Sequence, residues 1–129
     1  MGALLEQAHK EKRLLFEPVR FLSTALSGWE MPLSLVKLLQ QQDFVVTKGD
    51  ANYRRLVGDR HWPYDTEKEV VLSYYPCPIM MLRTLKSNVN VGVSKEKQEE
   101  AKQFHSSWDV SGKVGVIQFF SPHHSSVSF

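Results

Sequence analysis

The chain has 129 residues, of which 42% are hydrophobic and 23% are charged, and its formal net charge is +2. This composition is typical of a globular domain and excludes a chain that is disordered along its whole length. The small net charge gives no indication of a nucleic-acid-binding protein or of binding to a membrane surface. No stretch is apolar over the length that spans a bilayer, and the single cysteine, Cys77, suits a reducing compartment. We therefore expect a cytoplasmic protein.

The first half of the chain predicts helices followed by one strand. Residues 3–16 contain good helix formers, and residues 19–26 form a second apolar segment. Leucines at helical spacing predict a short helix over residues 35–41. Residues 44–47 are rich in β-branched side chains and lie between turn formers, which predicts a short buried strand.

Two helices are predicted after this strand from their starting residues. Asp50 is placed to cap a helix over residues 52–57, because its carboxylate can accept from free N–H groups of the first turn. Thr66 and Glu69 have the spacing of a capping box, which predicts a helix that reaches about Tyr74.

The rest of the chain alternates between strands and a helix. Ser94 is placed to cap a polar helix over residues 95–104, whose charged side chains face solvent. Runs of apolar and β-branched residues predict strands at 79–82, 89–93 and 113–120. This alternation indicates an α/β fold. The step from strand 44–47 to strand 79–82 fits a right-handed parallel crossover, so we expect a mostly parallel sheet.

Polar residues follow two of the predicted strands at their carboxyl ends, where ligands bind in open α/β sheets. Gly49 lets the backbone approach a ligand closely, and Asp50 and Asn52 can hold hydroxyl groups of a sugar or a phosphate ester. After the second strand, Lys86 can hold a phosphate as a point charge and Arg83 as a planar fork. The simpler alternative is that Asp50 is only a helix cap, Asn52 a turn residue and Lys86 a solvated lysine.

Other reactive side chains indicate less. Cys77 has no partner base in the sequence pattern and fits a small buried hydrophobe better than a nucleophile. His123 and His124 are adjacent, so their side chains do not converge on one metal ion as histidines four residues apart do.

Three blocks of residues carry a resemblance to a known family. The first block is Lys-Gly-Asp-Ala-Asn-Tyr-Arg-Arg-Leu at 48–56, followed by Gly-Asp-Arg at 58–60 and Trp62. The second is Pro-Cys-Pro at 76–78, followed by Leu-Arg-Thr-Leu-Lys at 82–86. The third is Trp108, followed by Ser-Gly-Lys at 111–113 and Ile-Gln-Phe at 117–119. Together, from about Leu35 to Phe119, they resemble the damage-control phosphatases. The Arg-Thr-x-Lys element resembles that of the sugar phosphate phosphatase subfamily.

The resemblance implies a three-layer α/β/α fold and metal-dependent hydrolysis of phosphate monoesters. It implies small sugar phosphates such as fructose 1-phosphate as substrates, and Mn²⁺, Ni²⁺ or Co²⁺ as the metal ion. A carboxyl methyltransferase activity that uses S-adenosylmethionine on acidic residues is also ascribed to the family. That activity is the weaker expectation, because the sequence has no glycine-rich nucleoside-binding loop.

The family's site residues carry over onto this sequence by motif. Its substrate-binding Gly-Asp-x-Asn-Tyr corresponds to Gly49, Asp50, Ala51, Asn52 and Tyr53. Its phosphate-contacting Arg-Thr-x-Lys corresponds to residues 83–86, so the resemblance implies substrate contacts from Arg83 and Lys86.

The sequence departs from the family pattern in three ways. Ala51 stands where leucine is usual, and residues 1–34 match poorly, as a helical segment. The family's metal ligands include an Asp-Asn pair upstream of these blocks, and no Asp-Asn dipeptide occurs here. We therefore expect residues 35–120 to be the C-terminal part of the family's metal-binding domain, truncated at its N-terminus, and residues 121–129 to be a flexible tail.

These departures leave an alternative to an active enzyme. The chain could be a non-catalytic fragment that keeps only a shelf for phosphate and substrate. A truncated sheet would also expose strand edges and an apolar face, so we expect marginal stability or self-association.

Overall fold

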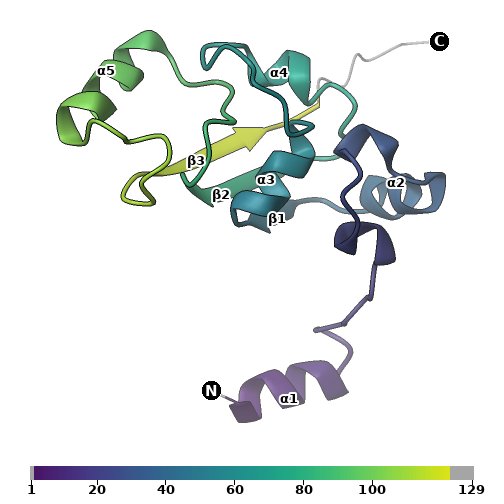
Figure 1. Ribbon diagram of the computed structural model, residues 1–129. Coiled ribbons are helices and arrows are strands. Elements are labelled where there is room, and N and C mark those ends of the chain that lie inside the picture. The colour runs from purple at the N-terminus through teal and green to yellow at the C-terminus, as the bar shows by residue number, and fades with distance from the viewer. Residues whose placement is uncertain (1, 123–129) are drawn as a thin grey trace.

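A three-stranded sheet lies at the centre of the protein in the computed structural model, which describes residues 2–122 (Figure 1). Its strands are β1 (Val45–Lys48), β2 (Ile79–Thr84) and β3 (Gly115–Phe120). The central strand, β2, runs parallel to β1 and antiparallel to β3, and Ile79 lies opposite both Val45 and Phe120. The predicted α/β class is confirmed.

Helices precede, connect and follow the strands. In residues 2–122 the α-helices are α1 (Gly2–Lys10), α2 (Leu33–Gln40), α3 (Asp50–Leu56), α4 (Lys68–Val71) and α5 (Lys95–Phe104), and the 3₁₀ helices are η1 (Arg20–Ser23) and η2 (Gly28–Glu30). Ser94 caps α5 as predicted, because its hydroxyl accepts from the Lys97 N–H at 3.3 Å. The predicted tail, residues 121–129, lies almost wholly outside the described residues.

The first helix, α1, is shorter than the predicted helix over residues 3–16. It ends at Lys10, and Lys12 has a positive φ of 57°, which a continuing right-handed helix does not allow. No residue of α1 is buried, and Figure 1 shows it apart from the body of the protein.

The predicted strand at residues 89–93 is wrong. Its backbone donors bond to other partners: Val91 N–H donates to the Tyr53 hydroxyl at 3.2 Å, and Gly92 N–H donates to the Thr66 carbonyl at 2.7 Å. Val93 N–H donates to the carbonyl of Tyr64 at 2.7 Å. The segment is therefore a connection that holds α3 and the loop between α3 and α4, and these N–H groups are not available to pair with a strand.

The predicted helix from Thr66 to Tyr74 is also wrong in length. Only α4, residues 68–71, is helical, and Thr66 makes no cap. Leu72 and Tyr75, which follow α4, are both buried, so the chain leaves the helix in order to place them in the core.

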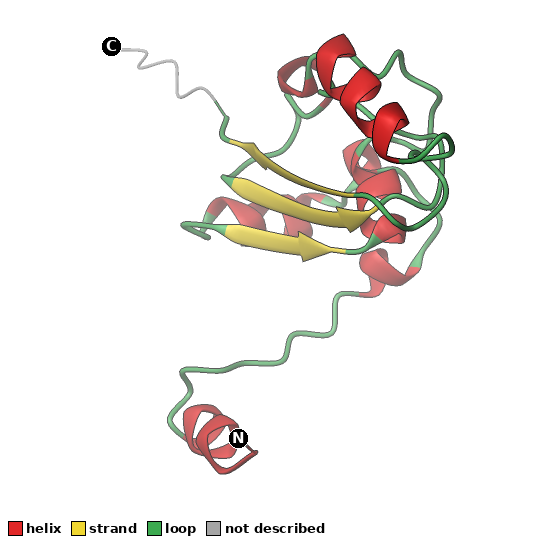
Figure 2. Ribbon diagram, turned by 90° about the vertical axis from the view of Figure 1, so that its left-hand side faces the viewer, coloured by secondary structure: helices red, strands yellow, loops and turns green. Residues whose placement is uncertain are grey.

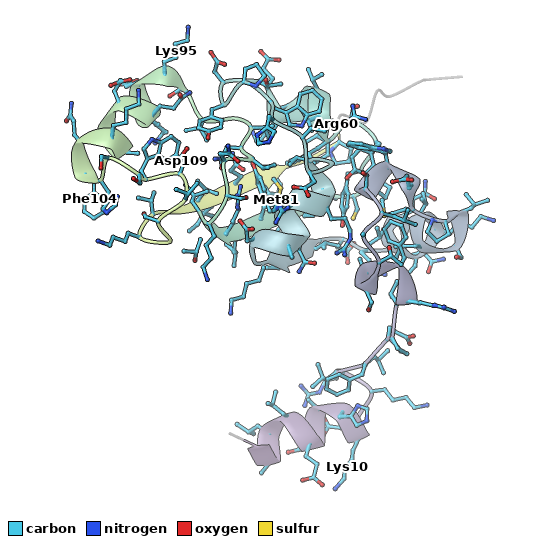
Figure 3. All side chains as sticks on the ribbon, in the orientation of Figure 1. Lys10, Arg60, Met81, Lys95, Phe104 and Asp109 are labelled. Atoms are coloured by element: carbon cyan, nitrogen blue, oxygen red, sulfur yellow. The ribbon has the colours of Figure 1, made fainter. Side chains whose placement is uncertain are left out.

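One face of the sheet carries the core. Ile79 and Met81 of β2 have no exposed surface, and they pack with Tyr53 and Leu56 of α3 and with Phe120 of β3. Figure 3 shows Met81 in the middle of the body. Burial of these apolar side chains on one face is what holds α3 against the sheet.

The opposite face of the sheet is open. Its exposed side chains are Phe44 at 45%, Val46 at 56%, Ile117 at 77% and Phe119 at 50%. In Figure 2 α5 lies above β3 and the other helices of the body lie behind the strands, so no helix of the described residues is drawn across this face. The predicted burial of β1 is therefore wrong, because Val46 points to the open face.

We expect this open face to drive self-association at high protein concentration, since exposed apolar patches of this kind favour contact with another surface. Sedimentation velocity over rising concentrations should show heavier species for the natural sequence. The double variant Val46→Lys and Phe119→Lys should remain monomeric, because pairing would bury the added charges.

The matched control is Val70→Lys. Val70 is 65% exposed but lies on α4, away from the sheet face, so this variant should associate like the natural sequence. A natural chain that stays monomeric at every concentration would contradict the expectation.

A second, smaller cluster lies where β2 and β3 meet α5. Its buried members are Leu85, Val93 and Trp108, and the Tyr64 ring packs edge-on against Trp108 at 5.6 Å. The Tyr64 hydroxyl donates to Asp109 Oδ2 at 2.8 Å. The pKa of Tyr64 is raised to about 12, mainly by burial and next by this hydrogen bond.

This shift predicts a loss of stability in alkaline solution. Because the pKa of Tyr64 is higher in the folded state than its ordinary value of 10.0, its contribution is complete below pH 10 and declines as the pH rises toward 12. Urea titrations at pH 9 and pH 11 should show a lower free energy of unfolding at pH 11. The Tyr64→Phe variant should lose less stability over this interval, and an equal loss would contradict this role of Tyr64.

Candidate functional site

The candidate site begins where β1 turns into α3, at Gly49. The Gly49 N–H donates to the Leu82 carbonyl at 2.8 Å and extends the parallel ladder, while its carbonyl accepts from the Tyr53 N–H at 3.2 Å. Its φ of 105° and ψ of 160° lie in a region that essentially only glycine adopts. Apart from its chain neighbours, no described residue has an atom within 4 Å of where a Cβ would stand, so the turn needs glycine for its backbone conformation and not for space.

Asp50 is the first residue of α3 and does not cap it. The cap position belongs to Gly49, and no side chain bonds to the free N–H groups there, so the predicted capping role of Asp50 is wrong. The carboxylate instead turns toward β2, and its Oδ1 accepts from Arg83 Nε at 2.8 Å. The two polar motifs that follow β1 and β2 are therefore in direct contact, as expected for neighbouring carboxyl ends of parallel strands.

Arg83 is fully buried at its side chain and uses every N–H of its guanidinium within the protein. Nη1 donates to Asn90 Oδ1 at 2.9 Å and to the Val89 carbonyl. Nη2 donates to the Ser87 carbonyl at 2.9 Å and to the Ser87 hydroxyl at 2.8 Å. With Nε on Asp50, all five donors have partners, so the predicted fork for a phosphate is occupied by the protein's own oxygen atoms.

Tyr53 packs against this network through its ring and its hydroxyl group. The Arg83 guanidinium lies over the Tyr53 ring, with its central carbon 4.4 Å from the ring centroid. The Tyr53 hydroxyl also bonds to the Val91 backbone, and the side chain is only 1% exposed. Burial raises the pKa of Tyr53, against the opposing effect of the hydrogen bond from Val91. Tyr53 is therefore in the core in this structure and presents no surface to a ligand.

Ala51 and Asn52 lie exposed on the first turn of α3. The Asn52 amide donates to the Lys48 carbonyl at 2.9 Å, and its oxygen accepts from Arg55 Nη1 at 3.2 Å. Asn52 thus braces the turn around Gly49 while it remains accessible to solvent.

Lys86 is exposed, and its ammonium makes no ion pair with any residue that the structure describes. The residue before it is fixed on both sides, because Leu85 N–H donates to Val114 O at 2.8 Å and Leu85 O accepts from Gly112 N–H at 2.7 Å. A Cβ on Gly112 would stand 3.7 Å from Lys86 Cε, so the lysine stem passes directly beside this glycine. Lys86 therefore offers a positive charge that no described residue pairs, on a backbone that is fixed by these two hydrogen bonds.

Ser87 and Asn90 belong to the site and were not predicted from the sequence. They bind Arg83 through a hydroxyl, a carbonyl and an amide oxygen, and Asn90 has no exposed surface. The polar run Ser-Asn-Val-Asn directly after Lys86 is the sequence signal that could have indicated them.

The acidic side chains near the site are paired with arginines. Asp50 binds Arg83, and Asp59 accepts two hydrogen bonds from Arg54 at 2.6 and 2.7 Å, which hold the pKa of Asp59 below its usual value. Among residues 2–122, no group of three or more histidine, cysteine, aspartate or glutamate side chains is arranged to hold a metal ion. The described residues therefore do not fit the Mn²⁺ or Ni²⁺ that the family resemblance implies. His123 and His124 lie outside the described residues.

Comparisons with known proteins agree with the resemblance read from the sequence. Residues 1–101 match the profile of the damage-control phosphatase ARMT1-like domain. The chain belongs to this family. Its predicted relation to the damage-control phosphatases is confirmed.

Three relatives show how much of the family protein is present. Damage-control phosphatase ARMT1 of Danio rerio is 40% identical over 91 residues, which are 70% of this chain and 20% of that protein. The Xenopus laevis protein of the same name is 41% identical over 81 residues, 62% of this chain and 18% of its own length. The Homo sapiens protein is 35% identical over 85 residues, 65% of this chain and 19% of its own length. The chain thus spans about a fifth of the length of these relatives.

Within the described part of the chain, no helix has both the length and the apolar character needed to cross a bilayer.

The buried network predicts a strong dependence of stability on Arg83. We expect Arg83→Lys to lower the free energy of unfolding by about 3 kcal/mol, because lysine keeps the charge but leaves buried acceptors without donors. Urea unfolding followed by circular dichroism measures this change. Arg54→Lys is the control, since its pair with Asp59 is exposed and should contribute under about 1 kcal/mol. Similar losses in the two variants would contradict the role assigned to Arg83.

Proposed function

We propose that this chain supplies the sugar-phosphate-binding part of a metal-dependent damage-control phosphatase that acts on small substrates such as fructose 1-phosphate. Family membership supports the phosphatase class. The observation that carries the proposal is that Lys86, three residues after Arg83 in the loop that follows β2, is exposed and makes no ion pair with a described residue. Arg83 itself joins the carboxyl ends of β1 and β2 through its bond to Asp50.

Each side chain then has a role that its position supports. Lys86 would neutralise negative charge on the phosphoryl group as it is transferred. Asp50 keeps 20% of its side chain exposed and would accept from a sugar hydroxyl, while Arg83 holds that carboxylate in place. Asn52 and the exposed backbone at Ala51 would border the sugar. The metal ion, Mn²⁺ or Ni²⁺, would take its ligands from outside the described residues.

A second candidate is binding of phosphorylated ligands without turnover. It is favoured by the pairing of Asp50 and Asp59 with arginines, because neither carboxylate is then free to hold a metal ion. The two candidates differ in whether phosphate is released.

The deciding experiment measures phosphate release from fructose 1-phosphate by the folded chain, with and without Mn²⁺. Under the phosphatase proposal, release should require the metal, and Lys86→Ala should lower kcat/KM by about 100-fold, since it removes a charge that faces the transferred group. The control is Lys37→Ala, because Lys37 is exposed on α2, outside the candidate site.

Calorimetry with fructose 1-phosphate separates the alternatives. Binding that disappears in Lys86→Ala, without any phosphate release, would support the non-catalytic candidate for this chain. If Lys86→Ala and Lys37→Ala behave alike in both assays, the role of Lys86 is contradicted.

A further inference from the structure

A groove runs along the outer edge of the sheet, between β3 and α5. Its volume is about 770 Å³. Apolar side chains from both sides line it, including Phe104 of α5, Trp108 and Val116. Figure 3 shows Phe104 at the end of α5 opposite to Lys95. None of the residues assigned to the phosphate site lines this groove, so the inference drawn from it does not rest on the proposed function.

The floor of the groove is a strand edge with free backbone groups. The sheet order is β1-β2-β3, so no strand among the described residues pairs with the outer side of β3. On the β1 side, the Gly49 N–H donates to the Leu82 carbonyl, and on the β3 side the Leu85 N–H donates to the Val114 carbonyl. Because backbone groups alternate in direction along a strand, the N–H and C=O of even-numbered β2 residues point toward β1, and those of odd-numbered residues point toward β3.

This alternation determines which way the backbone N–H and C=O groups of each β3 residue point. Val116 lies opposite Arg83 and Gln118 lies opposite Met81, so their backbone groups bond to β2. The N–H and C=O of Ile117, which lies between them, therefore point away from the sheet and into the groove. An extended segment that lies in the groove can pair with them as a fourth strand.

The charges around the groove indicate what kind of segment fits. Three lysines, Lys68, Lys97 and Lys113, and one acidic residue, Glu100, line it. Lys68 is paired with Glu69, whereas Lys97 and Lys113 have no ion pair with a residue that the structure describes. The groove therefore combines a backbone edge, apolar walls and an excess of positive charge.

We propose that the outer edge of β3 binds an extended acidic peptide segment of a partner protein by strand addition. Backbone pairing supplies the alignment, Lys97 and Lys113 attract its carboxylates, and alternate apolar side chains cover Phe104 and Val116. A second copy of this chain fits less well. Its β3 and the preceding Lys113 and Val114 carry no acidic residue, so two such edges would bring lysine against lysine.

The first test measures binding of labelled eight-residue peptides by fluorescence anisotropy. A peptide that alternates valine and glutamate should bind saturably, and one that alternates valine and lysine should bind at least ten times more weakly. The glutamate peptide with methyl groups on alternate backbone nitrogens should also lose at least tenfold, because it cannot donate to the strand edge. Equal binding of the methylated peptide would overturn strand addition, and equal binding of the lysine peptide would overturn the acidic preference.

Variants of the chain test the same two features. Ile117→Pro removes an N–H that faces the groove without breaking the ladder to β2, a change that edge strands tolerate. It should weaken binding of the glutamate peptide at least tenfold relative to Ile117→Ala, which shortens the same side chain but keeps the N–H. Near-ultraviolet circular dichroism checks that both variants fold.

A charge reversal supplies a test that does not depend on proline. The double variant Lys97→Glu and Lys113→Glu should weaken binding at least tenfold. The control is Lys95→Glu on the same helix, because Lys95 does not line the groove and its side chain is 87% exposed. If the double variant and the control bind alike, or if the peptide only shifts the chain's own self-association, the proposal is overturned.

Discussion

The buried contact between Asp50 and Arg83 joins the parts of the protein that carry its chemistry. Arg83 comes from the central strand, Asp50 from the first turn of α3, and the loop after β2 wraps around the same guanidinium through Ser87 and Asn90. A buried charge is unfavourable unless it is fully paired, so these oxygen atoms have little freedom to move independently. The position of Lys86 follows from this constraint, because it lies in the loop that Arg83 holds.

This arrangement separates two functions that a sequence motif presents as one. Within Arg-Thr-x-Lys, the arginine is buried and bonded to several parts of the protein, and the lysine is exposed and has no ion pair with a described residue. The same division holds in Gly-Asp-x-Asn-Tyr, where Tyr53 is buried beneath Arg83 and Asn52 is exposed. Residues adjacent in a motif can thus have opposite environments, because side chains in strands and helices alternate between faces.

The features that could be predicted were those with local causes. β1, β2, β3 and α5 follow from β-branched runs and from the cap at Ser94, and the meeting of the two polar motifs follows from parallel pairing. The segment at 89–93 could not be predicted correctly, because its apolar alternation is that of a strand while its hydrogen-bond partners, the Tyr53 hydroxyl and the loop near Thr66, are distant in sequence. That all five guanidinium donors of Arg83 have partners within the protein could not be predicted for the same reason, since a sequence does not show which oxygen atoms will surround a guanidinium.

The position of Phe120 has a consequence for how the chain acquires its structure during synthesis. This side chain is 3% exposed and packs in the main core against β2, although it is the last residue of β3. The central strand therefore lacks one neighbour, and the core lacks one wall, until synthesis has passed residue 120. Contacts between residues so far apart in sequence also slow folding, because the chain loses the entropy of closing a long loop before the contacts that stabilise the loop have formed. The apolar residues of β2 thus remain without their final cover while residues 85–120 are being synthesised.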